Sequence, residues 1–208
     1  MRVVIVDDDD FTRLTLSAVV RSLGHEVVGE ARDPVGAIDA ARAARPDAAI
    51  VDLDLGEGPT GIDVAHGLRN VLPHIGIVIL SSYADPRLMG RRSRPMPPGS
   101  QYVSKQEVAD ASVIADALRV STSRSESSDA GVSPVGLTDS QIEVMRLVAA
   151  GYSNAEIAKR LWLTEAAVNR AITRLVKHLR LEVTKELNAR VLIAREYSSL
   201  IGKPVTHG

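Results

Sequence analysis

The sequence predicts an α/β fold, a doubly wound five-stranded parallel sheet, followed by a small all-α domain. Short apolar runs such as residues 3–6 and 48–51 are typical of strands that are buried on both faces of a parallel sheet. They alternate with helical patterns over residues 1–120, whereas the pattern from residue 137 onward is wholly helical. Residues 121–136 hold six serines in sixteen positions, which is typical of a flexible linker between two domains.

The alternation defines each element of the first domain. Gly24 and Pro34 are residue types that favour a helix end and a helix start, respectively. We expect strands at 3–6, 26–31, 48–53, 75–80 and 101–103, and helices at 11–23, 34–44, 61–72 and 107–120.

Composition excludes several classes of protein. No apolar run approaches the roughly 20 residues that span a bilayer, and the apolar stretch at the start is too short for a secretory signal. The absence of cysteine excludes a disulfide framework and a thiol nucleophile. We therefore expect a cytoplasmic protein with no membrane partner.

Charge divides the chain into two halves. Residues 1–120 carry 13 Lys and Arg against 17 Asp and Glu, a net charge of -4. Residues 137–208 carry 11 against 7, a net charge of +4. This asymmetry suggests a metal or phosphate site in the first half and a polyanionic partner for the second.

Polar residues follow the predicted strands in an informative order. They are Asp7 and Asp8, then Asp52, then Ser81, then Lys105. The carboxyl ends of parallel strands meet at one edge of the sheet, where such folds bind ligands. Asp52 there supplies a nucleophilic oxygen, while Asp7 and Asp8 hold Mg²⁺. Ser81 and Lys105 offer a hydroxyl and a positive charge to phosphoryl oxygens.

The local sequences around these residues are Ile5-Val6-Asp7-Asp8, Leu80-Ser81-Ser82 and Tyr102-Val103-Ser104-Lys105. Over residues 1–120 they resemble the receiver domain of two-component response regulators, which has a flavodoxin-like fold. The resemblance implies that a sensor histidine kinase phosphorylates Asp52 and that Mg²⁺ binds Asp7, Asp8, Asp52 and the backbone carbonyl of Asp54. It also makes Ser81 and Tyr102 a switch pair.

Three features depart from the receiver pattern. Gly56 stands where the family usually has proline, and the loop to Gly61 is one residue longer than usual. The proline-rich, basic stretch 91–99 falls where the fourth helix and its following loop belong. A phosphorylation-independent receiver that acts as a protein-interaction module therefore stays open as an alternative.

Two other motifs lead to different functions. Residues 56–61 match the dinucleotide pattern G-x-G-x-x-G, but they follow the third strand, and Pro59 removes a donor N–H. Asp52-Leu53-Asp54 resembles the D-x-D nucleophile of haloacid-dehalogenase-type phosphatases. Those proteins keep an acidic pair downstream of the lysine, whereas here the pair lies upstream. We therefore do not expect an enzyme.

Helix-capping signals divide the second domain. Thr138 with Gln141 and Ser153 with Glu156 predict two capping boxes, and Gly151 ends the first helix. Residues 162–163 form a tight turn, and Thr164 caps a third helix that ends near 179. We place Trp162 in the core, together with Val168, Ile172 and Leu175. A short helix, a tight turn and a longer basic helix make a helix-turn-helix.

Residues 137–181 resemble the LuxR-type DNA-binding domain, so the whole chain resembles a NarL/FixJ-class response regulator. The resemblance implies a transcription regulator that binds double-stranded DNA as a homodimer. It also implies that phosphorylation controls dimerisation and DNA binding. A fourth helix at 182–201, with an apolar stripe of Leu187, Val191 and Ala194, contributes to dimerisation in this family. Asn169, Arg170 and Thr173 are the residues expected to contact bases, and Thr164, Arg174 and Lys177 to contact phosphates.

Overall fold

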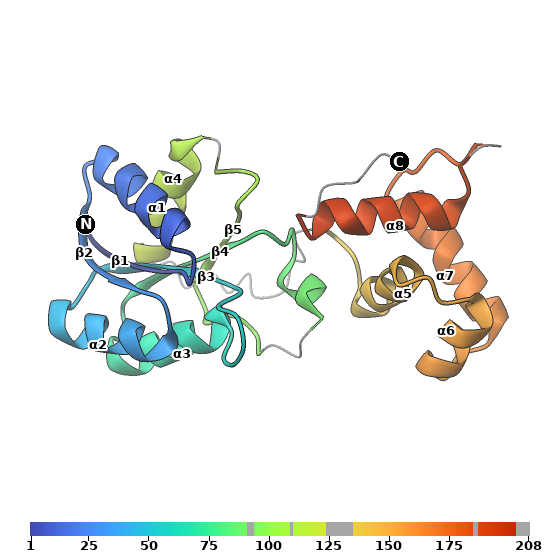
Figure 1. The fold of residues 1–208 in the computed structure, drawn as a ribbon, viewed down its shortest axis with the longest axis horizontal. Coiled ribbons are helices and arrows are strands. Elements are labelled where there is room, and N and C mark those ends of the chain that lie inside the picture. Colours follow the sequence, from blue (N-terminus) through green and yellow to red (C-terminus); the bar gives the residue numbers. More distant parts are fainter. Residues whose placement is uncertain (91–93, 109, 124–134, 185–186, 203–208) are drawn as a thin grey trace. The chain divides into compact units, whose positions relative to one another are not determined.

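The computed structural model of the protein describes residues 1–90, 94–108, 110–123, 135–184 and 187–202 (Figure 1). By their contacts these residues form two compact units, and each is described by itself. Residues 1–82 and 94–123 make up the first unit, and residues 83–90 and 135–202 make up the second. The second unit thus includes a short segment that lies, in sequence, within the predicted α/β domain.

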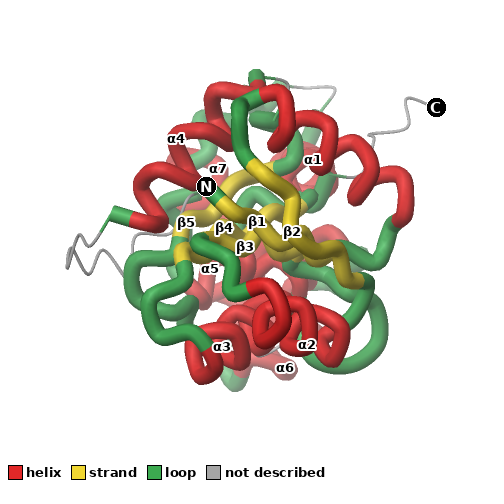
Figure 2. Tube along the Cα trace, turned by 90° about the vertical axis from the view of Figure 1, so that its left-hand side faces the viewer, coloured by secondary structure: helices red, strands yellow, loops and turns green. Residues whose placement is uncertain are grey.

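The first unit is built on a parallel sheet with the strand order β2-β1-β3-β4-β5. The strands are β1 (Arg2–Val6), β2 (Glu26–Ala31), β3 (Ala48–Asp52), β4 (Gly76–Ser81) and β5 (Gln101–Ser104). The helices are α1 (Asp10–Ser22), α2 (Pro34–Ala44), α3 (Gly61–Val71) and α4 (Ala111–Thr122). Helices α1 and α4 cover one face of the sheet, and α2 and α3 cover the other (Figure 2). The predicted doubly wound fold is confirmed.

The apolar runs form strands because both faces of the sheet are covered. Every residue of β3 and β4 is buried, as are the last four residues of β1. On one face Ile5 and Ile50 pack against Leu16 of α1 and Leu118 of α4 in one continuous cluster. Burial on both sides explains why these strands carry uninterrupted apolar residues rather than alternating ones.

Side-chain caps set the starts of the helices. Asp9 Oδ1 accepts a hydrogen bond from the backbone N–H of Thr12 at 2.7 Å, so α1 begins at Asp10. The last helix of the unit was predicted from residue 107, but α4 begins at Ala111. The reason is that Asp110 Oδ1 accepts from the backbone N–H of Ser112 at 2.8 Å.

The connection from β4 to β5 is irregular. Among its described residues there is a 3₁₀ turn, η1 (Pro86–Met89), and no α-helix. Within the predicted irregular stretch 91–99, residues 94–97 have no regular secondary structure, and residues 91–93 lie outside the described part of the chain. Of the predicted linker, residues 121 and 122 belong to α4, and 124–134 lie outside the described residues.

The second unit contains α5 (Asp139–Ala149), α6 (Asn154–Leu161), α7 (Glu165–His178) and α8 (Ala189–Leu200), together with η1. Their apolar faces share one core around Met145, Val168, Leu175 and Ile193. The short α6, the turn at 162–164 and the longer α7 form the predicted helix-turn-helix. None of the helices in the described residues is long and apolar enough to cross a membrane.

Two predictions for the fourth helix are wrong. The fourth helix begins at Ala189 rather than at residue 182, because Asn188 Oδ1 accepts from the backbone N–H groups of Arg190 and Val191, both at 3.0 Å. Its buried stripe also differs from the predicted Leu187, Val191 and Ala194. Val191 is 39% exposed, whereas Ile193 is fully buried.

The two predicted capping boxes also differ from each other. Thr138 and Gln141 form a reciprocal box at the start of α5. Ser153 caps α6 through the backbone N–H of Glu156, but the Glu156 carboxylate pairs with Arg160 at 2.9 Å instead.

Candidate functional site

Three carboxylates meet at the carboxyl edge of the sheet. Asp7 and Asp8 follow β1, and Asp52 ends the neighbouring strand β3. Val6 pairs with Val51, so the next residue of each strand, Asp7 and Asp52, lies side by side. Each of the three residues offers a carboxylate oxygen, and these atoms lie within 4.8 Å of one another. Asp7 and Asp52 are buried and Asp8 is exposed, so the cluster opens to solvent on one side.

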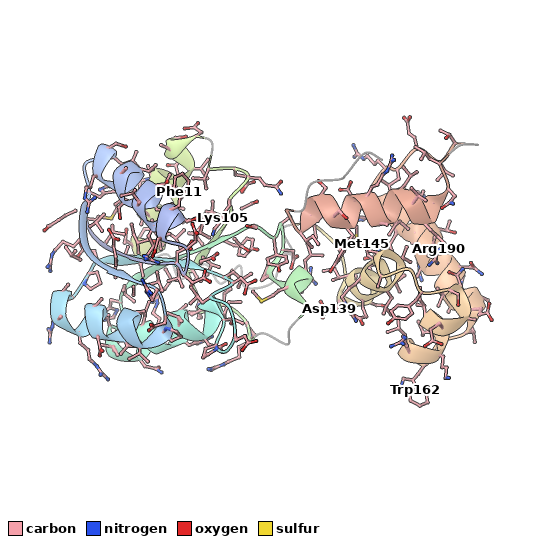
Figure 3. The ribbon with its side chains drawn as sticks, viewed as in Figure 1. Phe11, Lys105, Asp139, Met145, Trp162 and Arg190 are labelled. Atoms are coloured by element: carbon pink, nitrogen blue, oxygen red, sulfur yellow. The ribbon has the colours of Figure 1, made fainter. Side chains whose placement is uncertain are left out.

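Lys105 completes the cluster from the edge of the sheet. It directly follows β5, and its backbone N–H donates to the carbonyl oxygen of Ser81 at 2.6 Å. Its Nζ lies 3.0 Å from Asp7 Oδ2 and 3.2 Å from Asp52 Oδ1 (Figure 3 labels Lys105). Residues separated by almost a hundred positions in sequence thus form one polar pocket.

The electrostatics of the pocket centre on Asp52. The pKa of its carboxyl is raised to about 7: burial is the largest cause, the charge of Lys105 opposes the rise, and the charges of Asp7 and Asp8 add to it. Burial lowers the pKa of Lys105, but the charge of Asp52 and the hydrogen bond to Asp7 outweigh burial, and the pKa is raised overall. A pocket with three carboxylates and one amine has an excess of negative charge. A hard divalent cation fits it, because carboxylate oxygens are the ligands that such ions prefer.

Ser81 and Tyr102 occupy neighbouring strands. Ser81 ends β4 and is 1% exposed, and Tyr102 is half-buried in β5. Ile79 pairs with Tyr102, and Ser81 lies two residues beyond Ile79. Side chains alternate along a strand, so Ser81 and Tyr102 project from the same face of the sheet. Asp54 lies in the loop between β3 and α3, two residues after Asp52.

Gly61 belongs to this site, although the sequence assigned it to the start of a helix and to the rejected dinucleotide motif. A Cβ on Gly61 would lie 2.0 Å from the carbonyl oxygen of Asp52, so the start of α3 packs directly against the backbone of the phosphoacceptor candidate. The Gly61 N–H donates to the carbonyl of Leu53 at 2.9 Å. The one signal of this close approach in the sequence is the glycine itself, because a glycine has no Cβ and lets two backbones come together. Which backbone approaches it depends on tertiary structure.

A second layer of contacts fixes Asp7. Its Oδ1 accepts from the backbone N–H of Asp9 at 2.9 Å, and its carbonyl oxygen accepts from Arg13 Nη1 at 2.6 Å. The Asp7 carboxylate therefore has one oxygen bound to the backbone and the other turned to Lys105. Asp9 and Asp10 themselves are the cap and the first residue of α1, where acids are favourable because the helix N-terminus carries a partial positive charge.

The candidate nucleic-acid interface is one face of α7. Val168, Ile172 and Leu175 point into the core of the second unit, whereas the residues predicted to contact DNA lie on the exposed face. These exposed residues are Asn169, Arg170, Thr173, Arg174 and Lys177. Thr164 is exposed as well and caps α7 through the backbone N–H of Ala167 at 3.2 Å.

Hydrogen bonds that run from Arg190 through Asn154 fix the side chain of Asn169. Asn154, the first residue of α6, donates through Nδ2 to Asn169 Oδ1 at 2.7 Å. Arg190, near the start of α8, donates through Nη1 to Asn154 Oδ1 at 2.5 Å and through Nη2 to the carbonyl of Tyr152. The Arg190 side chain is labelled in Figure 3. This fixes Asn169 in a helix face that is otherwise open to solvent.

The prediction that Trp162 belongs to the core is wrong. Its side chain is 93% exposed and extends away from the helices in Figure 3. Trp162 is the C-cap of α6 and has a left-handed backbone conformation with a φ of 55°. The apolar spacing of the sequence suggested burial, but the left-handed turn directs this position outward.

Comparison with known proteins identifies both parts of the chain. Residues 3–113 match the family described as "Response regulator receiver domain", and residues 135–189 match "Bacterial regulatory proteins, luxR family". The first match covers more than half of the chain.

Relatives and solved structures match nearly the full length. The chain is 29% identical to the response regulator protein VraR of Staphylococcus aureus, over 88% of this chain and 91% of that protein. It is 27% identical to the transcriptional regulatory protein LiaR of Bacillus subtilis, over 95% of this chain and 98% of that protein. The response regulator RcsB in a DNA complex has a similar fold, with a TM-score of 0.55, 21% identity and coverage of 96% and 98%.

Proposed function

Because the chain belongs to the bacterial response regulators that join a receiver domain to a LuxR-type DNA-binding domain, we propose that a phosphoryl group on Asp52 controls its binding to DNA. The observation that carries this proposal is the pocket in which Asp7, Asp8 and Asp52 meet the amine of Lys105. A buried carboxylate beside two further acids and one amine supports phosphoryl transfer over a purely structural ion pair.

The chemistry follows from the positions of the side chains. An oxygen of Asp52 attacks the phosphorus of a phosphohistidine in the sensor kinase, so a P–O bond forms and the P–N bond to the imidazole breaks. Lys105, 3.2 Å from Asp52 Oδ1, stabilises charge on the phosphoryl oxygens. The hydroxyl of Ser81 donates a hydrogen bond to the same group. Asp7, Asp8, Asp52 and the backbone carbonyl of Asp54 would hold Mg²⁺, which when bound would neutralise charge on the phosphoryl group.

The surface of α1 fits a docking partner beside this pocket. Phe11 is 75% exposed and Leu14 is 67% exposed, one helical turn apart, just after the acidic loop that holds the pocket. Figure 3 labels Phe11 on this helix. Exposed apolar side chains of this size mark interaction surfaces, and a sensor histidine kinase is the partner that must approach Asp52.

The second unit supplies the output. Asn169, Arg170 and Thr173 contact base edges in the major groove, and Thr164, Arg174 and Lys177 contact backbone phosphates. The protein acts as a homodimer on paired half-sites in the cytoplasm and is not an enzyme. We keep as predictions a receiver domain at 1–120, a linker at 121–136 and a DNA-binding domain at 137–208. By their contacts, residues 83–90 of the predicted receiver domain group with the second unit.

A single assay tests the proposal. Acetyl phosphate with Mg²⁺ should place phosphate on the protein, and beryllofluoride should increase its affinity for a site selected from random double-stranded DNA. Asp52→Asn should abolish both effects, whereas Asp10→Asn, on the exposed first turn of α1, should retain them. Equal DNA affinity with and without beryllofluoride would refute phosphorylation control and favour the interaction-module alternative.

A further inference from the structure

Trp162, at the turn between α6 and α7, has a side chain that the folding of the second unit does not explain. The side chain is 93% exposed, and Figure 3 shows it extending away from the helices. A tryptophan stabilises a fold through the large apolar area that it buries, and this one leaves that area in water. The next residue, Leu163, is 42% exposed, so the apolar surface of the turn extends over both residues.

The backbone at Trp162 is also unfavourable for a large side chain. Its φ of 55° and ψ of 41° lie in the left-handed region, which bulky residues rarely adopt. Glycine is the residue that usually ends a helix in this conformation, because it has no Cβ to clash. Neither burial nor backbone conformation therefore accounts for a tryptophan here. Residues that are unfavourable for folding cluster at sites where they act on a ligand.

The position of Trp162 in the helix-turn-helix indicates what its side chain meets. When the second helix of such a motif lies in the major groove, its N-terminal residues contact base edges and the first helix crosses the DNA backbone. Trp162 is the C-cap of α6, and Thr164, two residues later, is the N-cap of α7. The indole therefore lies at the end of the first helix, where that helix reaches the sugars and phosphates.

The charges around the turn favour a polyanion. The start of α7 carries the partial positive charge of a helix N-terminus. Arg160, two residues before Trp162, is exposed, and its guanidinium is held over the ring of Tyr152 at 4.1 Å. Glu165 is the single acid of α7, against a net charge of +4 for residues 137–208. An indole also has one N–H donor beside its apolar ring, which suits a surface of deoxyribose carbons and phosphate oxygens.

We propose that Trp162 is a DNA-binding residue, whose ring packs against deoxyribose groups at the edge of the major groove and whose Nε1–H donates to a phosphate oxygen. This inference rests on the proposed function of the second unit. It adds an apolar contact outside α7 to the polar contacts of that helix. Sugar and phosphate are the same at every base pair, so Trp162 raises the affinity for all sequences alike. The indole carries no charge, so it leaves the salt dependence to the cations.

Fluorescence of the full chain tests the contact directly, because Trp162 is the only tryptophan in the sequence. In the free protein, acrylamide should quench the emission almost as strongly as it quenches an indole in water. Saturating double-stranded DNA should lower the quenching constant several-fold, with selected and unrelated sequences alike. Unchanged quenching in protein that has bound DNA would overturn the contact. Protein that binds no DNA, with or without beryllofluoride, would instead refute the proposed function, and the inference with it.

Variants of Trp162 separate the side chain from the backbone. Trp162→Gly suits the left-handed conformation, so it should unfold at the same temperature as the wild type or higher. Its affinity for labelled DNA should nevertheless fall about tenfold, equally for matched and single-mismatch sites and with an unchanged salt slope. Trp162→Phe keeps a ring without the N–H and should lose about threefold. Val183→Ala, at another exposed apolar residue of the unit, should bind as the wild type does.

Two results with these variants would contradict the proposal. A loss confined to one base position would replace the backbone contact by base reading. Wild-type DNA affinity in Trp162→Gly would remove the residue from the DNA interface. If transcription from a target promoter still fell in that variant, the partner of the exposed indole would be a protein rather than DNA.

Discussion

The acidic pocket and the exposed face of α7 are built in opposite ways. The pocket collects Asp7, Asp52 and Lys105 from three strand ends far apart in sequence, and two of the three are buried. The face of α7 takes its residues from one helix, and all of them are open to solvent. A pocket assembled by a sheet depends on the close packing of backbones, whereas a helical face depends on a few side-chain contacts. Substitutions should therefore affect the pocket through stability and chemistry, and the helix through affinity.

The largest effect is expected where packing positions the pocket. Gly61→Ala places a methyl group 2.0 Å from the Asp52 carbonyl oxygen, so the start of α3 must move. We expect a loss of about 3 kcal/mol or more in the free energy of unfolding of the first unit. In Gly67→Ala the added methyl would meet only the flexible end of Ile38, at 3.1 Å, and thermal unfolding should show a far smaller loss. Equal losses would contradict the account of Gly61.

Replacing Lys105, which supplies the positive charge of the pocket, should change the rate of phosphorylation more than the free energy of unfolding. Lys105→Ala leaves Asp7 and Asp52 without their common amine partner. We expect the rate of phosphorylation by acetyl phosphate to fall by about 10² to 10³, as for removal of a group that stabilises transition-state charge. Lys159→Ala, on the exposed side of α6, should keep the wild-type rate. A Lys105 variant that keeps that rate would remove the lysine from the mechanism.

Substitutions at α7 should separate two kinds of DNA contact. Arg174→Ala should weaken binding to all sequences and reduce the slope of log affinity against log salt by about 1, since a phosphate contact carries no sequence information. Asn169→Ala should instead cost about 1–3 kcal/mol at one base position and leave the salt slope unchanged. Titrations of matched and single-mismatch sites at several salt concentrations measure both quantities. A uniform loss for Asn169→Ala would contradict base reading.

Arg190 should influence the same base position at a distance. Arg190→Ala removes the anchor of Asn154, which holds Asn169. Because Arg190 positions Asn169 through Asn154, we expect roughly a threefold to tenfold loss of discrimination, smaller than for Asn169→Ala, with non-specific affinity preserved. Arg195→Ala, on the exposed side of α8, is the matched control. If Arg190→Ala lowered specific and non-specific affinity alike, the positioning role would be wrong.

The smallest effect is expected at the turn between α6 and α7. Trp162→Ala should change the free energy of unfolding by no more than about 0.5 kcal/mol, because the side chain is almost fully exposed. A tryptophan in the core would cost about 3–5 kcal/mol. Chemical denaturation of the two proteins distinguishes these values.

Most of the pocket could be predicted because strand ends in a parallel sheet converge. The apolar runs at residues 3–6 and 48–51 defined two strands, and the acids that follow them meet as expected. The exposed face of α7 followed from helical periodicity. Both inferences needed only local pattern and one rule of topology.

The remaining features depend on tertiary contacts that no local pattern contains. Trp162 has an apolar side chain, but a left-handed backbone directs it to solvent. Asn188 caps α8 in competition with an apolar pattern that predicted an earlier start. Residues 83–90 pack with helices more than fifty residues away, so nothing in their local sequence predicts that they belong to the second unit.

The most direct test of the central claim is to locate the phosphoryl group. After phosphorylation by acetyl phosphate and Mg²⁺, borohydride reduction converts an aspartyl phosphate to homoserine, which mass spectrometry assigns to a single position. We predict homoserine at residue 52 alone, and none in protein treated without the phosphoryl donor. Homoserine at Asp7, Asp8 or Asp54 instead, or at no position, would contradict the assignment of Asp52 as the phosphoacceptor.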